Sequence, residues 1–442
     1  MKRLIYLLSF MVLATSCDEF LDAKPNKQLV IPSNQEDINA ILNSFPWINI
    51  SPMIPFALAD DFITTDAHLE SLINFVQNAY AWDQELYGPD QTPFSYSGLF
   101  TNIFYANVVI GLLENLENID QKTKNTFYGE VHFIRARSYM ELANIYLPLP
   151  DTDLVPGYSL PLKISAEVNE QPQYLTADRI YGFIAEEIEK AVQLLPETNQ
   201  FLTRPTVYAA NGLKARLHLL LGNYVVAKEA ALKAMEGNFP LMDYNQVNGS
   251  LLYPFQKFNQ ETIYFNSVSN YFDLTSSEQS MVVSELYEKF EDNDIRKPLY
   301  FRLNENGFPL FRGSYTGNFE MFDGIAIDEI YLIAAEASIR LGDTNEGLHY
   351  LNTLLETRYL EGTYIPVENL DPQPALLKVL EERRKELVFR NQRWSDLKRL
   401  NLDPLTQTTI SRTINGQLKT LTPNSPQYIF NIPARERAFE SR

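Results

Sequence analysis

The chain has 442 residues, a formal net charge of −19, 45% apolar side chains and a single cysteine. So large a negative charge repels nucleic acid and anionic lipid headgroups, which disfavours both as partners. One cysteine provides no disulfide framework, so the fold must be held by an apolar core, which this length allows. Aromatic residues make up 12% of the chain, which suits either a large core or a surface for neutral, polar ligands.

The single cysteine, Cys17, directly follows an apolar N-terminal segment. Lys2 and Arg3 provide the positive start of a secretion signal, residues 4–13 form its apolar stretch, and three small residues precede the cysteine. We predict that residues 1–16 are a lipoprotein signal peptide. Cys17 then carries the lipid, and the domain is anchored to a membrane without spanning it. The alternative is a buried cysteine near an ordinary secretion signal.

The first part of the mature chain changes from irregular to helical. Residues 18–45 read as a tether that ends in a short helix near 36–44. Residues 46–98 contain several prolines and read as irregular, and irregular segments of this length are binding loops or wrapping segments. Apolar spacing and proline positions then predict helices over 99–116, 126–146, 176–195, 205–221 and 224–236.

The second part returns from mixed structure to helices. Residues 240–320 carry short runs of Tyr, Phe, Asn and Ser, which predict loops, short strands and a helix near 280–291. Apolar spacing predicts helices over 325–341, 345–359 and 374–389, the last continuing to residue 400. Asn415-Gly416 predicts a β-hairpin near the C-terminus.

Small residues recur at the same spacing in two helical pairs, with successive offsets of 7 and 5 residues. The two sets are Ala215, Gly222 and Ala227, and Ala335, Gly342 and Gly347. This order of small residue, turn glycine and small residue matches the tetratricopeptide pattern. We therefore predict a mostly α fold, in which tetratricopeptide-like pairs over about 99–237 and 325–400 stack into a right-handed superhelical scaffold. The alternative is a generic array of helical hairpins.

Motifs for catalysis are missing from the sequence. The four histidines lie in no H-E-x-x-H pattern, and there is no G-x-S-x-G, P-loop or G-x-G-x-x-G motif. Three pairs of carboxylates could be drawn as acid/base pairs or calcium ligands: Asp60 with Asp61, Asp151 with Asp153, and Asp292 with Asp294. In a chain with 56 acidic residues such pairs arise by chance. We predict a protein that is not an enzyme, with no catalytic residue, metal or cofactor. A glycoside hydrolase is kept as an alternative, because two carboxylates about 5–10 Å apart would suffice.

The most charged segment, residues 381–399, mixes acidic and basic residues three and four apart, which favours a salt-bridged helix. We expect Arg393 and Asp396 to clamp neighbouring turns of the chain and Trp394 to be a core anchor. Within this segment, ERRKEL at 382–387 and RWSDL at 393–397 resemble the signature of the SusD/RagB family of outer-membrane nutrient-binding lipoproteins. Further stretches similar to that family are residues 17–25, 135–150, 294–296 and 330–342.

The chain also departs from the family pattern. Arg390-Asn391 replaces an acidic-glycine pair, Leu400 stands where an aromatic residue is common, and the chain is short. The resemblance nevertheless spans almost the whole mature chain.

The resemblance implies a cell-surface lipoprotein of the outer membrane that has no catalytic residues. Such proteins capture a glycan, or sometimes a peptide, and pass it to a TonB-dependent (SusC-like) transporter. The helical scaffold then contacts the transporter, and the irregular segments 46–98 and 240–320 form the ligand surface. The alternative is a scaffold that binds peptides or proteins in its repeat groove.

A glycan site needs an aromatic face for sugar C–H groups, flanked by hydrogen-bonding groups for hydroxyls. The stretch around residue 82 offers this best, although each of its rings is at least as well explained as core. The predicted ligand contacts are Asn78, Tyr80, Trp82, Asp83 and Tyr87, with Tyr271 from the second irregular segment.

Overall fold

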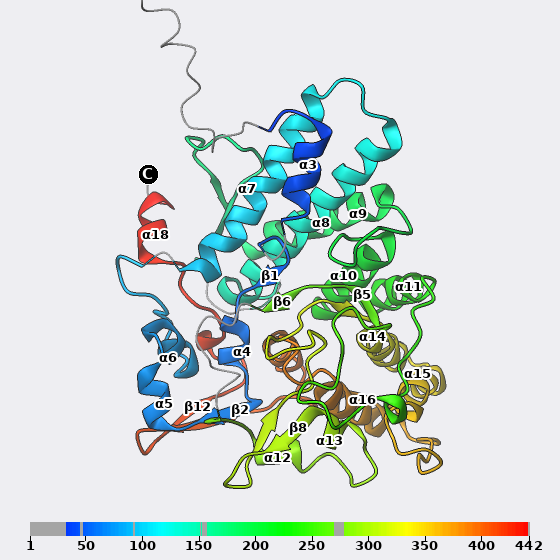
Figure 1. The fold of residues 1–442 in the computed structure, drawn as a ribbon. Helices are drawn as coiled ribbons and strands as arrows, with labels where there is room; N and C mark the ends of the chain where they lie inside the picture. Colours follow the sequence, from blue (N-terminus) through cyan, green and yellow to red (C-terminus); the bar gives the residue numbers. More distant parts are fainter. Residues whose placement is uncertain are drawn as a thin grey trace, which may run out of the picture.

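A computed structural model describes residues 32–44, 47–91, 93–150, 152, 157–268 and 278–440. Cys17 and Tyr271, which were predicted as lipid site and ligand contact, lie outside these residues. Figure 1 shows long helices following one another along one side of the molecule, with short helices and strands gathered on the other.

The long helices form an array in which neighbours in the chain pack on one another. They are α7 (Phe94–Asn115), α8 (Gln121–Tyr146), α9 (Ala177–Leu194), α10 (Val207–Leu220), α11 (Tyr224–Met235), α14 (Ile327–Arg340), α15 (Thr344–Glu356) and α16 (Pro372–Glu386). Each helix from α7 to α11 packs on the next, α11 packs on α14, and α14 packs on both α15 and α16. This nearest-neighbour packing is the property of a helical repeat.

The recurring small residues lie where two helices meet closely. Gly222 and Gly342 occupy the turns with φ of +71° and +92°, a conformation that favours glycine. A Cβ atom on Gly347 would lie 2.7 Å from the backbone oxygen of Ala335, the small residue of the partner helix. The prediction of a mostly helical, tetratricopeptide-like scaffold is confirmed.

The remaining elements are short. The helices are α3 (Gln35–Leu42), α4 (Ile54–Leu58), α5 (Asp66–Ser71), α6 (Asn74–Tyr80), α12 (Ser284–Tyr287), α13 (Arg296–Tyr300), α17 (Arg393–Leu400), α18 (Ala434–Glu440), and the 3-10 turns η2 (Tyr244–Gln246) and η3 (Pro426–Tyr428). The strands pair two by two: β1 (Ile50–Ser51) with β6 (Ser267–Val268), β2 (Phe62–Thr64) with β7 (Ser280–Val282), β3 (Leu160–Leu162) with β4 (Gln173–Leu175), β5 (Thr262–Tyr264) with β10 (Ile325–Ala326), β8 (Phe301–Leu303) with β9 (Pro309–Phe311), and β11 (Ile410–Ile414) with β12 (Gln417–Leu421).

The prediction that residues 46–98 lack regular structure is wrong in part, because α4, α5, α6 and the start of α7 lie within them. Two predicted helices also differ from the structure. The helix expected at 280–291 is wrong at its start, because Ser280–Val282 is strand β7 and pairs with β2. The helix expected to run on to residue 400 is broken between α16 and α17, where Phe389 and Asn391 have φ of +57° and +60°. The predicted hairpin is confirmed, since Asn415 and Gly416 turn between β11 and β12 with φ of +50° and +73°.

The main core joins the scaffold to the irregular segments. Phe56 of α4, Trp394 of α17 and Ile333 of α14 belong to one buried cluster, which confirms Trp394 as a core residue. A smaller cluster packs α3 on α7 and α8 through Ile38 and Leu42, and Figure 1 shows α3 lying across these helices. Among the described helices, α7 alone has the length and apolar composition to cross a membrane, a property that core helices share.

Candidate functional site

The aromatic stretch predicted as a sugar platform lies in the core. Trp82 is 1% exposed and Tyr80 is 2% exposed. The guanidinium carbon of Arg412 lies 4.0 Å from the ring centre of Tyr80 and 4.7 Å from that of Trp82. The indole Nε1 of Trp82 donates a hydrogen bond of 2.9 Å to the backbone oxygen of Leu58. This burial contradicts the prediction that the two rings present an open face to a sugar.

The other members of this stretch are also engaged in internal contacts. The hydroxyl of Tyr87 lies 2.6 Å from that of Tyr146, and burial raises the pKa of Tyr87 to about 12. The side-chain amide of Asn78 donates to the backbone oxygen of Leu86 at 3.0 Å. Among the described residues predicted as ligand contacts, only Asp83 is exposed.

The two irregular segments are joined by strand pairs. In the first pair, β1 runs parallel to β6 with Ile50 opposite Ser267. In the second, β2 runs antiparallel to β7 with Phe62 opposite Val282. Residues 46–98 and 240–320 therefore meet along both pairs, although about two hundred residues separate them in the chain.

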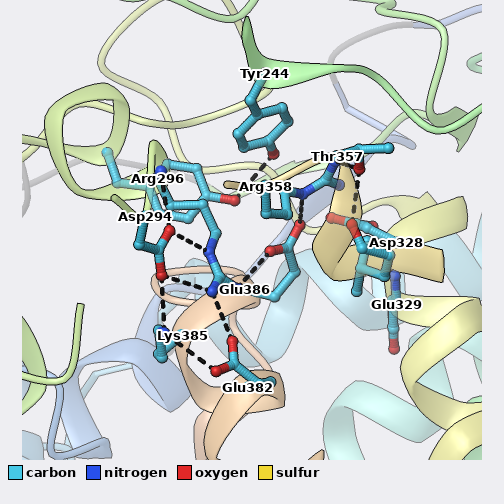
Figure 2. A network of polar contacts seen from close by, with 12 residues as sticks. Tyr244, Asp294, Arg296, Asp328, Glu329, Thr357, Arg358, Glu382, Lys385 and Glu386 are labelled. Carbon is cyan, nitrogen blue, oxygen red and sulfur yellow. Dashed lines mark hydrogen bonds and ion pairs between the residues drawn. The ribbon is translucent and has the colours of Figure 1, made fainter. Parts of the chain in front are cut away.

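A buried network of ion pairs connects the charged helix α16 with the second irregular segment (Figure 2). Its members are Glu261, Asp294, Arg296, Arg358, Glu382, Lys385 and Glu386. The side chain of Arg296 reaches carboxylates of Glu382 at 2.6 Å and Glu386 at 3.0 Å. Arg358 continues the network from Glu386 at 2.7 Å to Glu261 at 2.8 Å.

The charges of this network keep the Glu382 carboxylate ionised inside the protein. Burial alone would raise the pKa of Glu382, but the charges of Arg296 and Lys385 outweigh it and hold that pKa well below its usual range. Because every charge has an opposite partner, α16 is fixed in position relative to α13 and its neighbouring loops.

The same helical region also fastens the first irregular segment. Arg393 at the start of α17 bonds the Asp60 carboxylate at 2.7 Å, and Arg384 of α16 reaches it at 3.1 Å. Arg384 also contacts Asp61 at 3.3 Å. In the same stretch, Asp396 pairs with Arg383 and Arg399 of the helical region at 2.9 and 2.8 Å. The expectation that Asp396 clamps a neighbouring turn is confirmed by its bond to Arg399, whereas Arg393 instead reaches Asp60, 333 residues away in the chain. The charged stretch therefore holds both irregular segments against the scaffold.

The residues that depart from the family signature have internal partners of their own. The guanidinium of Arg390 lies 3.2 Å from Asp328 and 4.4 Å from the ring centre of Tyr315. Asn391 donates to the Asp323 carboxylate at 3.3 Å. The Arg-Asn pair therefore builds buried contacts where the usual acidic-glycine pair could not.

Comparisons with known proteins agree with this arrangement. Residues 19–219 match a SusD-like family described as starch-binding and associating with the outer membrane, and residues 327–439 match the SusD family. The chain belongs to the SusD family. No curated protein sequence matches it.

Solved structures of SusD-family proteins share the fold along almost their full length. A SusD superfamily protein from Bacteroides vulgatus is 21% identical with a TM-score of 0.74, covering 93% of this chain and 98% of its own. One from Bacteroides thetaiotaomicron is 17% identical with a TM-score of 0.74, covering 92% and 98%. A SusD-like protein described as laminarin-binding is 17% identical with a TM-score of 0.66, also covering 92% and 98%.

The carboxylate pairs weighed for acid–base chemistry have other partners in this SusD-family chain. Asp60, Asp61 and Asp294 are each bound to a guanidinium or ammonium group, and Asp292 is exposed. Asp151 and Asp153 lie outside the described residues. Across the part of the chain that the structure describes, no three His, Cys, Asp or Glu side chains are grouped to hold a metal ion.

The second irregular segment of this family member carries a shallow pocket that the sequence did not single out. Its walls include Tyr253, Phe311 and Phe319, and Arg302 and Asn318 supply polar groups. Phe319 is 45% exposed, so its ring is open to solvent. The only sequence signal was the density of Tyr, Phe and Asn between residues 240 and 320.

Proposed function

We propose that this protein binds oligosaccharides at the outer-membrane surface and delivers them to a partner TonB-dependent (SusC-like) transporter. A lipid on Cys17 anchors it, and it performs no catalysis. Membership of the SusD family supports this proposal, and the laminarin-binding neighbour supports a glycan as the ligand. The mixed pairing of acidic and basic groups in the charged helix gives no support to a nucleic-acid partner.

The observation that carries the proposal is the junction of the two irregular segments. The strand pairs β1–β6 and β2–β7 hold these segments together. Beside the junction, the Phe319 pocket offers an open ring with neighbouring polar groups, which is the combination that a sugar needs.

The ligand is tested by calorimetric titration of the mature chain with a broad panel of oligosaccharides. We expect Phe319→Ala to weaken binding of the preferred sugar by roughly tenfold, because it removes the exposed ring. Phe201→Ala is the matched control, since Phe201 is 47% exposed and lies outside this pocket. Tight peptide binding without sugar binding would favour the alternative of a peptide-binding scaffold.

The anchor and the partner are tested separately in cells. Labelled palmitate should be incorporated into the protein and lost from Cys17→Ala. Capture of the protein from detergent-solubilised outer membranes should retain a TonB-dependent β-barrel, and its absence would contradict the delivery step.

A further inference from the structure

A large groove lies away from the junction of the irregular segments. It opens between α7 and the β3–β4 hairpin, with Glu436 of α18 at one end, and has a volume of about 580 Å³. Pockets for small ligands commonly measure roughly 300–1,000 Å³. The groove therefore has the size for two or three sugar rings.

One wall of the groove is a row of aromatic side chains. Tyr96, Phe100 and Phe104 line it at four-residue intervals, so they share one face of α7. Their exposure increases along the helix: Tyr96 is buried, Phe100 is half-buried and Phe104 is 38% exposed. The outer rings can stack on the C–H face of a sugar.

The opposite wall is polar and held in place. Asn107 of α7 donates to the backbone oxygens of Lys163 at 3.2 Å and Ser165 at 3.0 Å. The backbone N–H of Lys163 donates to the hydroxyl of Tyr139 at 2.7 Å. These bonds fix the hairpin to the helices, so the groove exists before a ligand arrives. The amide side chains of Asn169 and Gln171 also line this wall.

The inner end of the groove holds an unpaired hydroxyl. Tyr96 is 3% exposed, and within the described part of the chain its phenol oxygen has no hydrogen-bond partner. A buried hydroxyl without a partner is costly. A ligand hydroxyl would supply the missing bond.

The charges around the groove select against anions. Glu167, Glu170 and Glu436 line it, and Lys163 is the one described cation among the lining residues. The ammonium group of Lys163 is directed to the backbone oxygen of Glu170 at 2.8 Å. A neutral ligand avoids the repulsion that a uronate or sulfated sugar would meet.

We propose that this groove is a second carbohydrate site, which binds a neutral oligosaccharide against Phe100 and Phe104 with a hydrogen bond to the Tyr96 hydroxyl. This inference rests on the proposed glycan function but assigns a different surface from the Phe319 pocket. The ring of Phe104 is solvent-exposed, so it can be removed without opening the core.

The test uses the Phe319→Ala variant, in which sugar affinity at the Phe319 pocket is reduced. This variant is titrated with laminaritriose, maltotriose and trigalacturonate. A neutral trisaccharide should still bind, and adding Phe104→Ala should weaken this remaining binding by roughly tenfold. Adding Phe201→Ala is the matched control, because Phe201 is 47% exposed and lies outside the groove. Tyr96→Phe should weaken the binding without lowering the melting temperature, since its hydroxyl has no internal bond to lose.

Three results would overturn the inference while leaving the proposed function intact. The first is that Phe319→Ala by itself abolishes all sugar binding. The second is that adding Phe104→Ala leaves the affinity of the Phe319→Ala variant unchanged. The third is that the Phe319→Ala variant binds trigalacturonate more tightly than the neutral trisaccharides. Failure of the unmodified protein to bind any sugar of a broad panel would instead contradict the proposed function itself.

Discussion

Arg296 and Glu382 are 86 residues apart in the chain, yet they form an ion pair of 2.6 Å with both side chains fully buried. Burying an isolated charge costs several kcal/mol, and only close partners offset this cost. Arg296 has three such partners, since Asp294 and Glu386 also contact its guanidinium. Loss of Arg296 would leave several carboxylates facing one another in the core.

We therefore expect Arg296→Met to lower the free energy of unfolding by about 3–5 kcal/mol, the range for a buried pair that loses one partner. Urea unfolding at neutral pH measures this loss. Lys233→Met is the control, because the pair of Lys233 with Glu236 is exposed and its removal should leave the midpoint unchanged. Equal effects of the two substitutions would show that the network does not hold α16 in place.

We expect Trp82 to contribute to the stability of the fold and not to sugar binding. Trp82→Ala should destabilise the protein by about 3–5 kcal/mol, as large-to-small changes in a core do. Trp82→Phe should destabilise it less and leave sugar affinity unchanged, because Arg412 covers the indole. Unfolding and calorimetric titration of the same samples separate the two roles. A Trp82→Phe variant with normal stability and reduced sugar affinity would show instead that this ring contacts the ligand.

The parts of the fold that follow from neighbouring residues were predictable. Asn415-Gly416 specified its hairpin through local turn chemistry, and the small residues at 335 and 347 specified a close helical pair. The start of the helix expected at 280–291 was wrong because β2, more than two hundred residues earlier, offers β7 a strand partner. Local propensity carries no information about such a partner.

The site was harder to predict for the same reason. Tyr80 and Trp82 have the composition of a sugar platform, but Arg412, 332 residues from Tyr80, covers both rings, and the indole of Trp82 is bonded to Leu58. These contacts make both rings part of the core. Conversely, Phe319 and Phe104 have no motif around them and become candidates through their exposure beside polar groups. Exposure of an aromatic residue depends on the tertiary structure, which composition does not provide.

Close approach of α14 and α15 makes Gly347 sensitive to substitution. Gly347→Ala should lower the free energy of unfolding by about 1–3 kcal/mol, because the added methyl group meets the Ala335 backbone and the Ile339 side chain. Gly182→Ala in α9 is the control, since no atom lies within 4 Å of its added Cβ. It should be neutral or stabilising by up to about 1 kcal/mol. Thermal melts of the two variants compare them directly.

Glu141 gives the protein a pH dependence whose sign is opposite to that of an ordinary ion pair. Burial, then the Asp323 carboxylate beside it, raises the pKa of Glu141 to about 8 against the opposing charges of Arg137 and Arg216. The folded protein thus retains a proton that the unfolded chain loses near pH 4.5. The resulting stability is fully present below that pH and is lost as the pH rises through about 8.

Glu141→Gln replaces this carboxyl group with a neutral group of the same shape, so it should remove the dependence. The variant and the unmodified protein should have similar free energies of unfolding near pH 4.5, and the variant should be more stable by pH 8. The half-buried position of Glu141 reduces the difference to roughly 1–2 kcal/mol. Urea unfolding at four values between pH 4.5 and 8.5 measures it. Parallel pH curves for the two proteins would show that Glu141 is ionised in the folded state.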